Sequence, residues 1–251
     1  LPIYPTFAHL PFVMGQDNAK LSKRNGEVSI AWYREQGFLP VAICNYLALL
    51  GWSPGEDRED ISMKELVELF EVHDVHSSPA RFDMKKLEAI NGDKIRALSP
   101  DDFLNWSLPF LTSAGIITGT DAEISLVKSA LPIIQERIVK LDEIPAMLKF
   151  LFVKEFVIEA DSKEKIKDDQ SKQVLKRAIE VLEPITNWNH ESIETALRTA
   201  LIEELGLKPR IAFGAVRIAA TGSHISPPLF ESLELLGKDS AISRIKSAIN
   251  L

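Results

Sequence analysis

The sequence predicts a mainly α-helical protein with a short mixed α/β segment at its N-terminal end. Leu, Ile, Ala, Lys and Glu dominate the composition and aromatic residues make up only 8% of it, a balance that favours helices. From residue 40 onward, apolar residues recur at the three- and four-residue spacing of an amphipathic helix. Residues 1–37 are instead punctuated by Pro and Gly, and the apolar run at residues 10–14 predicts a short buried strand.

Capping residues predict where the helices begin. An N-cap side chain, or a proline in the first turn, satisfies or removes amide groups that a helix leaves unpaired at its start. In chain order, such signals stand at Pro40, Ser62 with Glu65, Asp83, Ser99 with Pro100, Asp121, Ser226 with Pro227, and Asp239. Pro132 is expected to bend or split the helix that Asp121 opens, because proline lacks the N–H of a helix interior.

A polar stretch divides the helical region. Residues 161–173 contain almost no apolar side chain, so they predict a linker or a solvated first turn between two helical subdomains. No internal repeat and no low-complexity tract accompanies it.

The charge balance bounds the partners. A net charge of −7 at first sight argues against a polyanion, because phosphates are neutralised by Lys and Arg, but binding faces are local and the total excludes nothing. A single cysteine, Cys44, allows no internal disulfide, which favours a reducing cytoplasm. The apolar stretch at residues 41–52 is too short to span a bilayer, and no secretory signal opens the chain, so we expect no membrane partner.

A basic pentapeptide is the first candidate site. Its residues are Lys20, Leu21, Ser22, Lys23 and Arg24, and small residues flank it. Cations clustered on a mobile loop suit a triphosphate, since they offset the charge that develops on the leaving group when the α-phosphorus is attacked. The alternative is a solvated basic turn without function.

A second candidate site lies near the C-terminus, where residues 205–230 contain no acidic side chain. The stretch supplies the cations Lys208, Arg210 and Arg217, the proton-switchable His224, the ring of Phe213 and the hydroxyls of Thr221 and Ser223. Cations for phosphates or base edges and a ring for an unstacked base are what an RNA contact face needs. The alternative is a chance clustering of cations at helix ends.

Two other patterns are set aside. His73 and His76 lack further His or Cys ligands nearby, so they predict a surface loop, and we expect no metal site in the chain. The paired acids of the sequence are expected to be solvated or to cap helices.

Several blocks resemble known segments of one family. The pentapeptide with the residues before it is similar to the signature loop of class I aminoacyl-tRNA synthetases in its bacterial glutamyl form; those residues read Pro5-Thr6-Phe7-Ala8-His9-Leu10-Pro11-Phe12-Val13-Met14-Gly15-Gln16-Asp17. Further similar blocks span residues 37–40, 45–53, 78–87, 217–222 and 228–237. The order is right along nearly the whole chain, although residues 99–200 match in helical character more than in motif. The family more often has Lys-Ser or Arg-Ser before Ala80.

The resemblance implies roles for both candidate sites. Lys23 would contact ATP phosphates during glutamate activation, with Lys20 and Arg24 supporting it. Arg210 and Arg217 would contact the anticodon and Lys208 the RNA backbone, with Phe213 among the anticodon-binding residues. The implied partners are tRNA(Glu), L-glutamate and ATP with magnesium, for a cytoplasmic monomer.

The resemblance also implies a domain order. Residues 1–98 would hold the signature-loop end of a class I catalytic domain and a stem-contact domain, and residues 99–165 and 166–251 two helical bundles that form an anticodon-binding cage. The sequence starts without Met and has no HIGH-type motif, so we expect a fragment that binds tRNA without forming glutamyl-adenylate. Alternatives are a stand-alone, non-catalytic tRNA-binding module and a purely structural helical interaction domain. Acceptance of tRNA(Gln) stays open.

Overall fold

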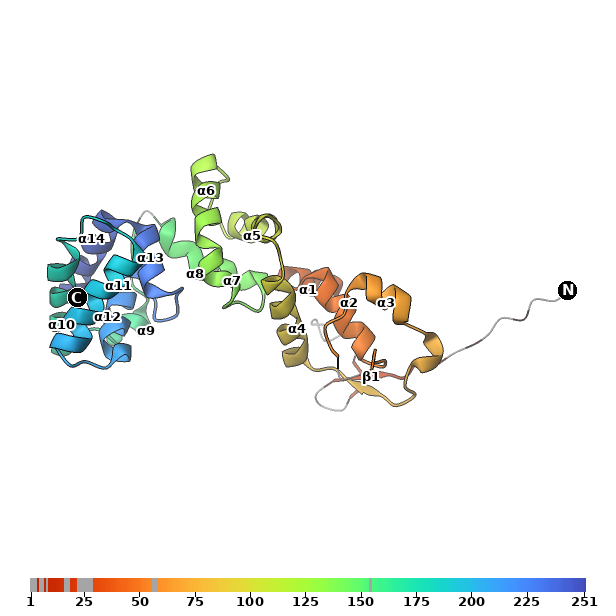
Figure 1. The fold of residues 1–251 in the computed structure, drawn as a ribbon. Coiled ribbons are helices and arrows are strands. Elements are labelled where there is room, and N and C mark those ends of the chain that lie inside the picture. The colour runs from red at the N-terminus through yellow and green to blue at the C-terminus, as the bar shows by residue number, and fades with distance from the viewer. Residues whose placement is uncertain are drawn as a thin grey trace. The chain divides into compact units, whose positions relative to one another are not determined.

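The protein is mainly helical, as predicted (Figure 1). The computed structural model describes residues 4, 7, 9–15, 19–21, 29–55, 58–153 and 155–251. Two compact units share the chain: unit 1 comprises Leu1–Ser99 and Ile138–Glu143, and unit 2 comprises Pro100–Arg137 and Ile144–Leu251. Within the described ranges, no helix combines the length and apolar composition needed to cross a membrane.

Unit 1 combines a small sheet with short helices. In chain order its elements are β1 (Val13–Met14), α1 (Ile30–Glu35), α2 (Pro40–Leu49), α3 (Met63–Leu69), the 3-10 turn η2 (Val72–Asp74), β2 (Ala80–Arg81), α4 (Met84–Arg96) and the 3-10 turn η3 (Leu141–Glu143). The strands pair in parallel, Val13 opposite Ala80 and Met14 opposite Arg81.

The prediction of a buried strand over residues 10–14 is wrong. Only Val13 and Met14 form the strand, and Leu10 and Phe12 are 68% and 59% exposed. Hydrophobicity marks a strand as buried only where a second layer covers it, and most of the surface of these two side chains is left exposed.

The caps expected in unit 1 are present. The Ser62 hydroxyl accepts from the backbone N–H of Glu65, whose carboxylate accepts from the N–H of Ser62 in return. Asp83 accepts from the N–H groups of Lys85 and Lys86 at the start of α4. Both caps satisfy amide groups that lack partners within the first helical turn, which is why the local sequence predicted these starts.

A buried amide on α4 joins three segments of unit 1. The Oδ1 atom of Asn91 accepts from the N–H of Leu39 at 2.8 Å, and its Nδ2 atom donates to the carbonyl of Val139 at 2.6 Å. Leu141 donates its N–H to the carbonyl of Gly37 at 3.1 Å. These bonds hold residues Ile138–Glu143 in unit 1, although helices of unit 2 precede and follow them in the chain.

Unit 2 is built from helices throughout its described residues. They are α5 (Pro100–Ser113), α6 (Asp121–Ala130), α7 (Pro132–Gln135), α8 (Ile144–Leu148), the turn η4 (Lys149–Leu151), α9 (Ala160–Glu164), α10 (Asp169–Leu182), α11 (His190–Arg198), the π-helical turn η5 (Thr199–Glu204), α12 (Pro209–Thr221), α13 (Leu229–Leu236) and α14 (Lys238–Ile249). The predicted break at Pro132 is confirmed, since α6 ends at Ala130 and α7 starts at Pro132.

The polar stretch at residues 161–173 is not an open linker. It forms α9 and the first turn of α10, and Ser162 and Ile166 in it are buried. The Asp168 side chain caps α10 by accepting from the N–H of Ser171 at 2.8 Å. Of the two alternatives predicted for this stretch, the linker is wrong and the solvated first turn of a helix is confirmed at the start of α10. The burial of Ser162 could not be predicted from polarity, because a hydroxyl can be buried when it is hydrogen-bonded.

The core of unit 2 lies among its last helices. In Figure 1, α10, α11 and α12 lie together with α13 and α14 at the C-terminal end. Buried side chains from each meet there, including Leu175, Leu197, Val216, Leu233 and Ile245. Helix α11 runs without interruption into the π-helical turn η5, which buries Ala200 and Leu201.

Replacing Asn91 tests the hydrogen bonds that hold Ile138–Glu143 in unit 1. Asn91→Ala leaves the buried N–H of Leu39 and the carbonyl of Val139 without partners, so unit 1 should lose on the order of 3 kcal/mol of stability. Hydrogen exchange at the amides of Leu39 and Leu141 should speed up accordingly. Asn250→Ala, which removes only an exposed 3.5 Å contact, is the control and should leave both rates unchanged.

The cap of α6 predicts a pH dependence. Hydrogen bonds, first from the backbone N–H of Thr120 and then from the hydroxyls of Thr120 and Thr118, lower the pKa of Glu123 from 4.5 to about 2. A depressed carboxyl pKa stabilises the fold above the unfolded value, and that stabilisation is lost as the pH falls towards the folded value. Glu123→Gln should therefore lower the unfolding temperature near neutral pH, and the difference should shrink between about pH 4.5 and 2. A difference independent of pH would contradict this account.

Candidate nucleic-acid interface

The turn after β1 carries the first candidate site. The chain returns beside the strand, where Leu21 donates its N–H to the carbonyl of Val13 at 3.0 Å and Lys20 bridges to Met14. The exposed Lys20 ammonium lies 3.8 Å from the centroid of the Phe12 ring. Such an exposed cation–π contact is worth only about 0.5–1 kcal/mol, so Lys20 could exchange the ring for a phosphate.

The remaining polar residues of the pentapeptide, Ser22, Lys23 and Arg24, lie outside the described residues. Their part in ATP binding therefore stays a prediction, as does that of Lys20. What the structure describes is the stem of the turn, which fixes where the pentapeptide leaves β1.

Three of the sequence blocks meet beside this stem. Phe82, next to β2, donates its N–H to the carbonyl of Met14 at 2.8 Å. The hydroxyl of Tyr46 on α2 accepts from the N–H of Asp83 at 2.6 Å, and the Tyr46 and Phe82 rings pack edge to face with centroids 5.1 Å apart. Burial raises the pKa of Tyr46. These residues pack and hydrogen-bond beside the stem of the turn.

The second candidate site follows α12. Lys208 stands at the N-cap and is exposed, as is Arg210 in the first turn, while Arg217 is half-buried. Seven residues are about two helical turns, so Arg210 and Arg217 share one side of α12, about 10 Å apart along its axis.

Lys208, Arg210 and Arg217 differ from neighbouring cations in having no acidic partner. Among the described residues, none of the three forms an ion pair. Other cations of unit 2 do: Arg177 pairs with Glu180 and Glu204, Arg198 with Glu194, Lys128 with Asp101 and Lys246 with Glu183. Within the described part of the chain, these three cations of the α12 region therefore have no acidic partner.

Phe213 lies on α12 between the two arginines and is partly committed to packing. Its ring meets that of Phe230 edge to face with centroids 5.3 Å apart, and the Arg198 guanidinium lies 5.5 Å from its centroid. The ring is half-buried against the core of unit 2. Its role in stacking on a base stays a prediction and would use only the exposed part of the ring.

Arg217 occupies an unfavourable place for a charge. Its Nε atom is buried without a hydrogen-bond partner. Burial lowers the pKa of Arg217, and the nearby positive charge of Arg137 lowers it further. The charge of Arg217 is therefore unfavourable in the chain alone, and an anion bound beside it would offset that cost.

Arg137 is the functional candidate that the sequence did not indicate. It is exposed in the turn after α7, far along the chain from Arg217. Nothing in the local pattern marks it, because its proximity to Arg217 arises only from the packing of unit 2.

The loop after α12 is pinned to α9. Gly222 ends the helix with φ +84°, and a Cβ there would lie 2.8 Å from the carbonyl oxygen of Val157. The Ser162 hydroxyl meets both the backbone N–H (3.1 Å) and Nδ1 (3.0 Å) of His224. Thr221 is buried and its hydroxyl donates to the carbonyl of Arg217 at 2.9 Å, so the expected surface donor at Thr221 is wrong.

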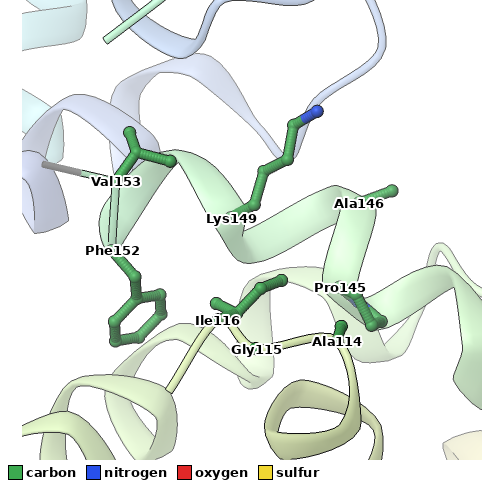
Figure 2. Close-up of a pocket in the computed structure, with 8 residues that line it drawn as sticks. All are labelled: Ala114, Gly115, Ile116, Pro145, Ala146, Lys149, Phe152 and Val153. Atoms are coloured by element: carbon green, nitrogen blue, oxygen red, sulfur yellow. The ribbon is translucent and has the colours of Figure 1, made fainter. Parts of the chain in front are cut away.

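A hollow of about 440 Å³ also opens in unit 2. It is lined by Ala114, Gly115, Ile116, Pro145, Ala146, Lys149, Phe152 and Val153. Figure 2 shows the Lys149 amine pointing away from the apolar lining, and that amine lies 3.2 Å from Glu159. Reaction sites bring several polar groups together, and this lining does not.

Metal ligands do not gather in the described part of the chain. No group of three or more His, Cys, Asp and Glu side chains there could hold an ion. His73 lies near Glu71 and Asp74, at 3.9 and 3.4 Å, on the exposed turn η2.

Two family models match the chain. The one described as the anticodon binding domain matches residues 102–249, and the one described as the catalytic domain of class I tRNA synthetases (E and Q) matches residues 1–89. The first match covers more than half of the chain and includes all four predicted residues on α12.

The similar proteins are glutamate–tRNA ligases. The chain is 48% identical over 249 residues to that of Nocardioides sp., 48% over 246 residues to that of Paenarthrobacter aurescens, and 45% over 248 residues to that of Saccharopolyspora erythraea. The alignments cover 98%, 97% and 98% of this chain but 51%, 49% and 49% of the relatives. The chain thus spans about half the length of the curated relatives it matches.

Two solved structures are similar to this chain along nearly its whole length. A crystal structure of a glutamate tRNA ligase from Elizabethkingia meningosepticum in complex with its amino acid superposes with a TM-score of 0.80 at 26% identity, over 98% of this chain and 52% of that one. The glutamate-tRNA synthetase of Elizabethkingia anophelis gives a TM-score of 0.79 at 25% identity, over 99% and 52%.

Arg244 on α14 offers a matched comparison for Arg217. It is also half-buried, and burial lowers its pKa. Its guanidinium, however, donates to the carbonyls of Ala220 and Phe150, each at 3.0 Å, and lies 4.3 Å from the Phe156 ring centroid. Arg244 is satisfied by the fold, whereas Arg217 is not.

The two arginines should therefore respond oppositely to the same substitution. Arg217→Met removes a desolvated charge beside Arg137 and should stabilise unit 2 by on the order of 1 kcal/mol, or about 2–4 °C in unfolding temperature. Arg244→Met strands two carbonyls and should destabilise it by about 1–3 kcal/mol. Thermal unfolding in a low-salt chloride buffer gives both values, and a loss of stability in Arg217→Met would show that the fold itself uses that charge.

Proposed function

The chain belongs to the anticodon-binding-domain family and corresponds to the C-terminal portion of glutamate–tRNA ligases, and from that premise we propose that it binds tRNA(Glu) and reads its anticodon. The observation that carries this proposal is Arg217, whose buried Nε has no hydrogen-bond partner and whose guanidinium has no acidic partner among the described residues. Folding alone gives no reason for such a charge, whereas an anionic ligand does.

The residues of α12 have distinct roles in this proposal. The guanidinium groups of Arg210 and Arg217 present several donors in a plane, which suits base edges and phosphate oxygens. Lys208 contacts the RNA backbone as a point charge, and the exposed part of Phe213 stacks on a base. Arg137 joins this set by its proximity to Arg217.

The pentapeptide serves the other substrate. In the two-step reaction, glutamate is first activated by ATP to the adenylate and then transferred to tRNA. Lys23, supported by Lys20 and Arg24, would hold the ATP phosphates and offset charge on the departing pyrophosphate. Magnesium would arrive bound to those phosphates, as is usual for this ion. The described stem supports this role, because Leu21 and Lys20 bond beside β1 directly before the rest of the pentapeptide.

The chain by itself is proposed to bind tRNA without activating glutamate. It spans about half of its relatives, and its sequence contains no HIGH-type nucleotide-binding motif. We assign residues 1–98 to the signature-loop segment and stem-contact domain, and residues 99–165 and 166–251 to two anticodon-binding bundles. The whole protein would act in the cytoplasm as a monomer.

A titration with two RNAs tests this function. The chain should bind tRNA(Glu) more tightly than the same tRNA with an altered anticodon, and log affinity should fall with log salt by about 0.7 per phosphate contact to single-stranded RNA. Equal and strongly salt-dependent binding to both RNAs would mean that the chain contacts phosphates but does not recognise the anticodon. Salt-independent or absent binding would favour the structural interaction domain.

Substitutions on α12 test which residues recognise the anticodon. Arg217→Ala and Arg210→Ala should each weaken binding of tRNA(Glu) by about 1–3 kcal/mol and reduce the preference for the native anticodon. Lys208→Ala should weaken the binding of both RNAs equally. It should also reduce the slope of log affinity against log salt by about 0.7. Lys246→Ala, at a cation already paired with Glu183, is the control. Glutamate-dependent pyrophosphate exchange by this chain alone would contradict its proposed lack of activation.

A further inference from the structure

Arg198, the last residue of α11, lies beside the ring that the proposed function places against the anticodon. Its guanidinium lies over the ring of Phe213, 5.5 Å from the centroid, and 6.0 Å from the centroid of Phe230. The two rings pack edge to face with their centroids 5.3 Å apart. A cation within about 6 Å of a ring centroid is attracted to the ring, so both phenylalanines hold the guanidinium in place.

The ring of Phe213 joins Arg198 to the side of α12 that carries the other candidate contacts. Arg210, Phe213 and Arg217 follow one another at spacings of three and four residues, which places them on one side of the helix. Phe213 is half-buried, so part of it is accessible. Arg198 therefore extends this side of α12 onto α11, a helix of the same compact unit.

Glu194 fixes the orientation of the Arg198 guanidinium. It lies one turn earlier on α11, and its Oε1 atom accepts from Nε of Arg198 at 2.6 Å. Neither Nη group of Arg198 has a hydrogen-bond partner among the described residues. The side chain of Arg198 is 50% exposed, so a ligand can reach it. The fold thus uses the Nε atom and leaves the two Nη groups as a coplanar pair of donors.

Arg177 on α10 shows the opposite arrangement. Its Nη1 and Nη2 atoms donate to Glu180 and Glu204, at 2.8 and 2.6 Å. Both groups are therefore used within unit 2, whereas those of Arg198 are not. An arginine that is held by its Nε atom and by two rings, with both Nη groups open, is preorganised to donate to a ligand.

The carboxylate of Glu194 also decides which kind of group the guanidinium of Arg198 binds. The two charges largely cancel, so the pair attracts a phosphate only weakly. A hydrogen bond to a neutral acceptor needs no net charge, and the Nη groups can still donate to a base edge. Since the donors lie in one plane, they fit a base with two neighbouring acceptors, such as O6 and N7 of guanine or O2 and N3 of cytosine.

We propose that Arg198, held over Phe213 and oriented by Glu194, recognises one base of the anticodon by donating from both Nη groups to two neighbouring acceptors on the base edge. The base stacks on the accessible part of the Phe213 ring, and Glu194 keeps a phosphate from taking its place. This inference deepens the proposed function and rests on it. It adds a specificity-determining residue on α11 to the contacts on α12.

The test compares dissociation constants for tRNA(Glu) and for the same tRNA with each anticodon base replaced in turn. Arg198→Lys keeps the charge but loses the coplanar donors. The preference for the native base should therefore fall about tenfold at one anticodon position and stay within about twofold at the other two. The unfolding temperature should change little, because an exposed ion pair contributes little to stability.

Arg177→Lys is the matched control. It makes the same substitution at an arginine of unit 2 whose Nη groups are already bonded within the fold. All three base preferences should stay within about twofold of the parent's, in the range of an unperturbed contact.

Glu194→Gln tests the role of the carboxylate. The amide oxygen can still accept from Nε of Arg198, but the negative charge is lost, so the guanidinium becomes able to attract a phosphate. The native and altered tRNAs should both bind more tightly, and the slope of log affinity against log salt should become steeper by about 0.7. A purely structural role for the pair predicts an unchanged slope, and that result would contradict the proposal.

Three further results would overturn the assignment of Arg198. One is an unchanged preference at every position in Arg198→Lys while Arg217→Ala reduces a preference. Another is an equal loss at all three positions, which a structural role predicts. The third is equal weakening of all tRNAs by Arg198→Ala with a shallower salt slope, which a phosphate contact predicts. If Arg210→Ala and Arg217→Ala also leave every preference unchanged, the proposed function itself fails.

Discussion

The side chain of Asn91 is fully buried, and both ends of its amide bond to backbone groups of other segments: the N–H of Leu39 and the carbonyl of Val139. A buried amide left half-satisfied is costly, so this arrangement is strongly preferred over any in which the segment around Val139 departs. Because that segment stays in unit 1, the chain passes between the units three times, at residues 99/100, 137/138 and 143/144. Neither unit is a continuous stretch of sequence, and no single cut separates them.

Arg217 and Arg244 are both half-buried arginines of unit 2, but only Arg244 has its guanidinium satisfied by the fold. Arg244 donates to two carbonyls and lies over an aromatic ring, so burial of its charge is compensated. Arg217 is buried to a similar degree beside Arg137 with its Nε unpaired. Functional sites commonly retain such unfavourable groups, because the ligand supplies the missing partner. The contrast explains why burial alone would not have distinguished them.

Local chemistry explains which features the sequence could predict. The caps at Ser62 and Asp83 and the break at Pro132 depend on groups only a few residues apart, so they can be predicted from the local sequence. The return of Ile138–Glu143 depends on Gly37 and Asn91, which no local pattern connects with it. The same holds for the candidate site: the cations of α12 were apparent from composition, whereas Arg137 required the packed unit. Roles at the pentapeptide rested on resemblance and remain predictions.

The π-helical turn η5 bears on how this part of the family can change in length. A π turn holds one more residue than an α turn while the helix before and after it keeps its direction. Thr199–Glu204 buries Ala200 and Leu201, so this turn takes part in the core of unit 2. A homologue lacking one residue here could wind the stretch as ordinary α-helix with α11 and α12 left in place. Single-residue gaps in alignments of this domain are therefore best placed at residues 199–204, and not in the loop that follows.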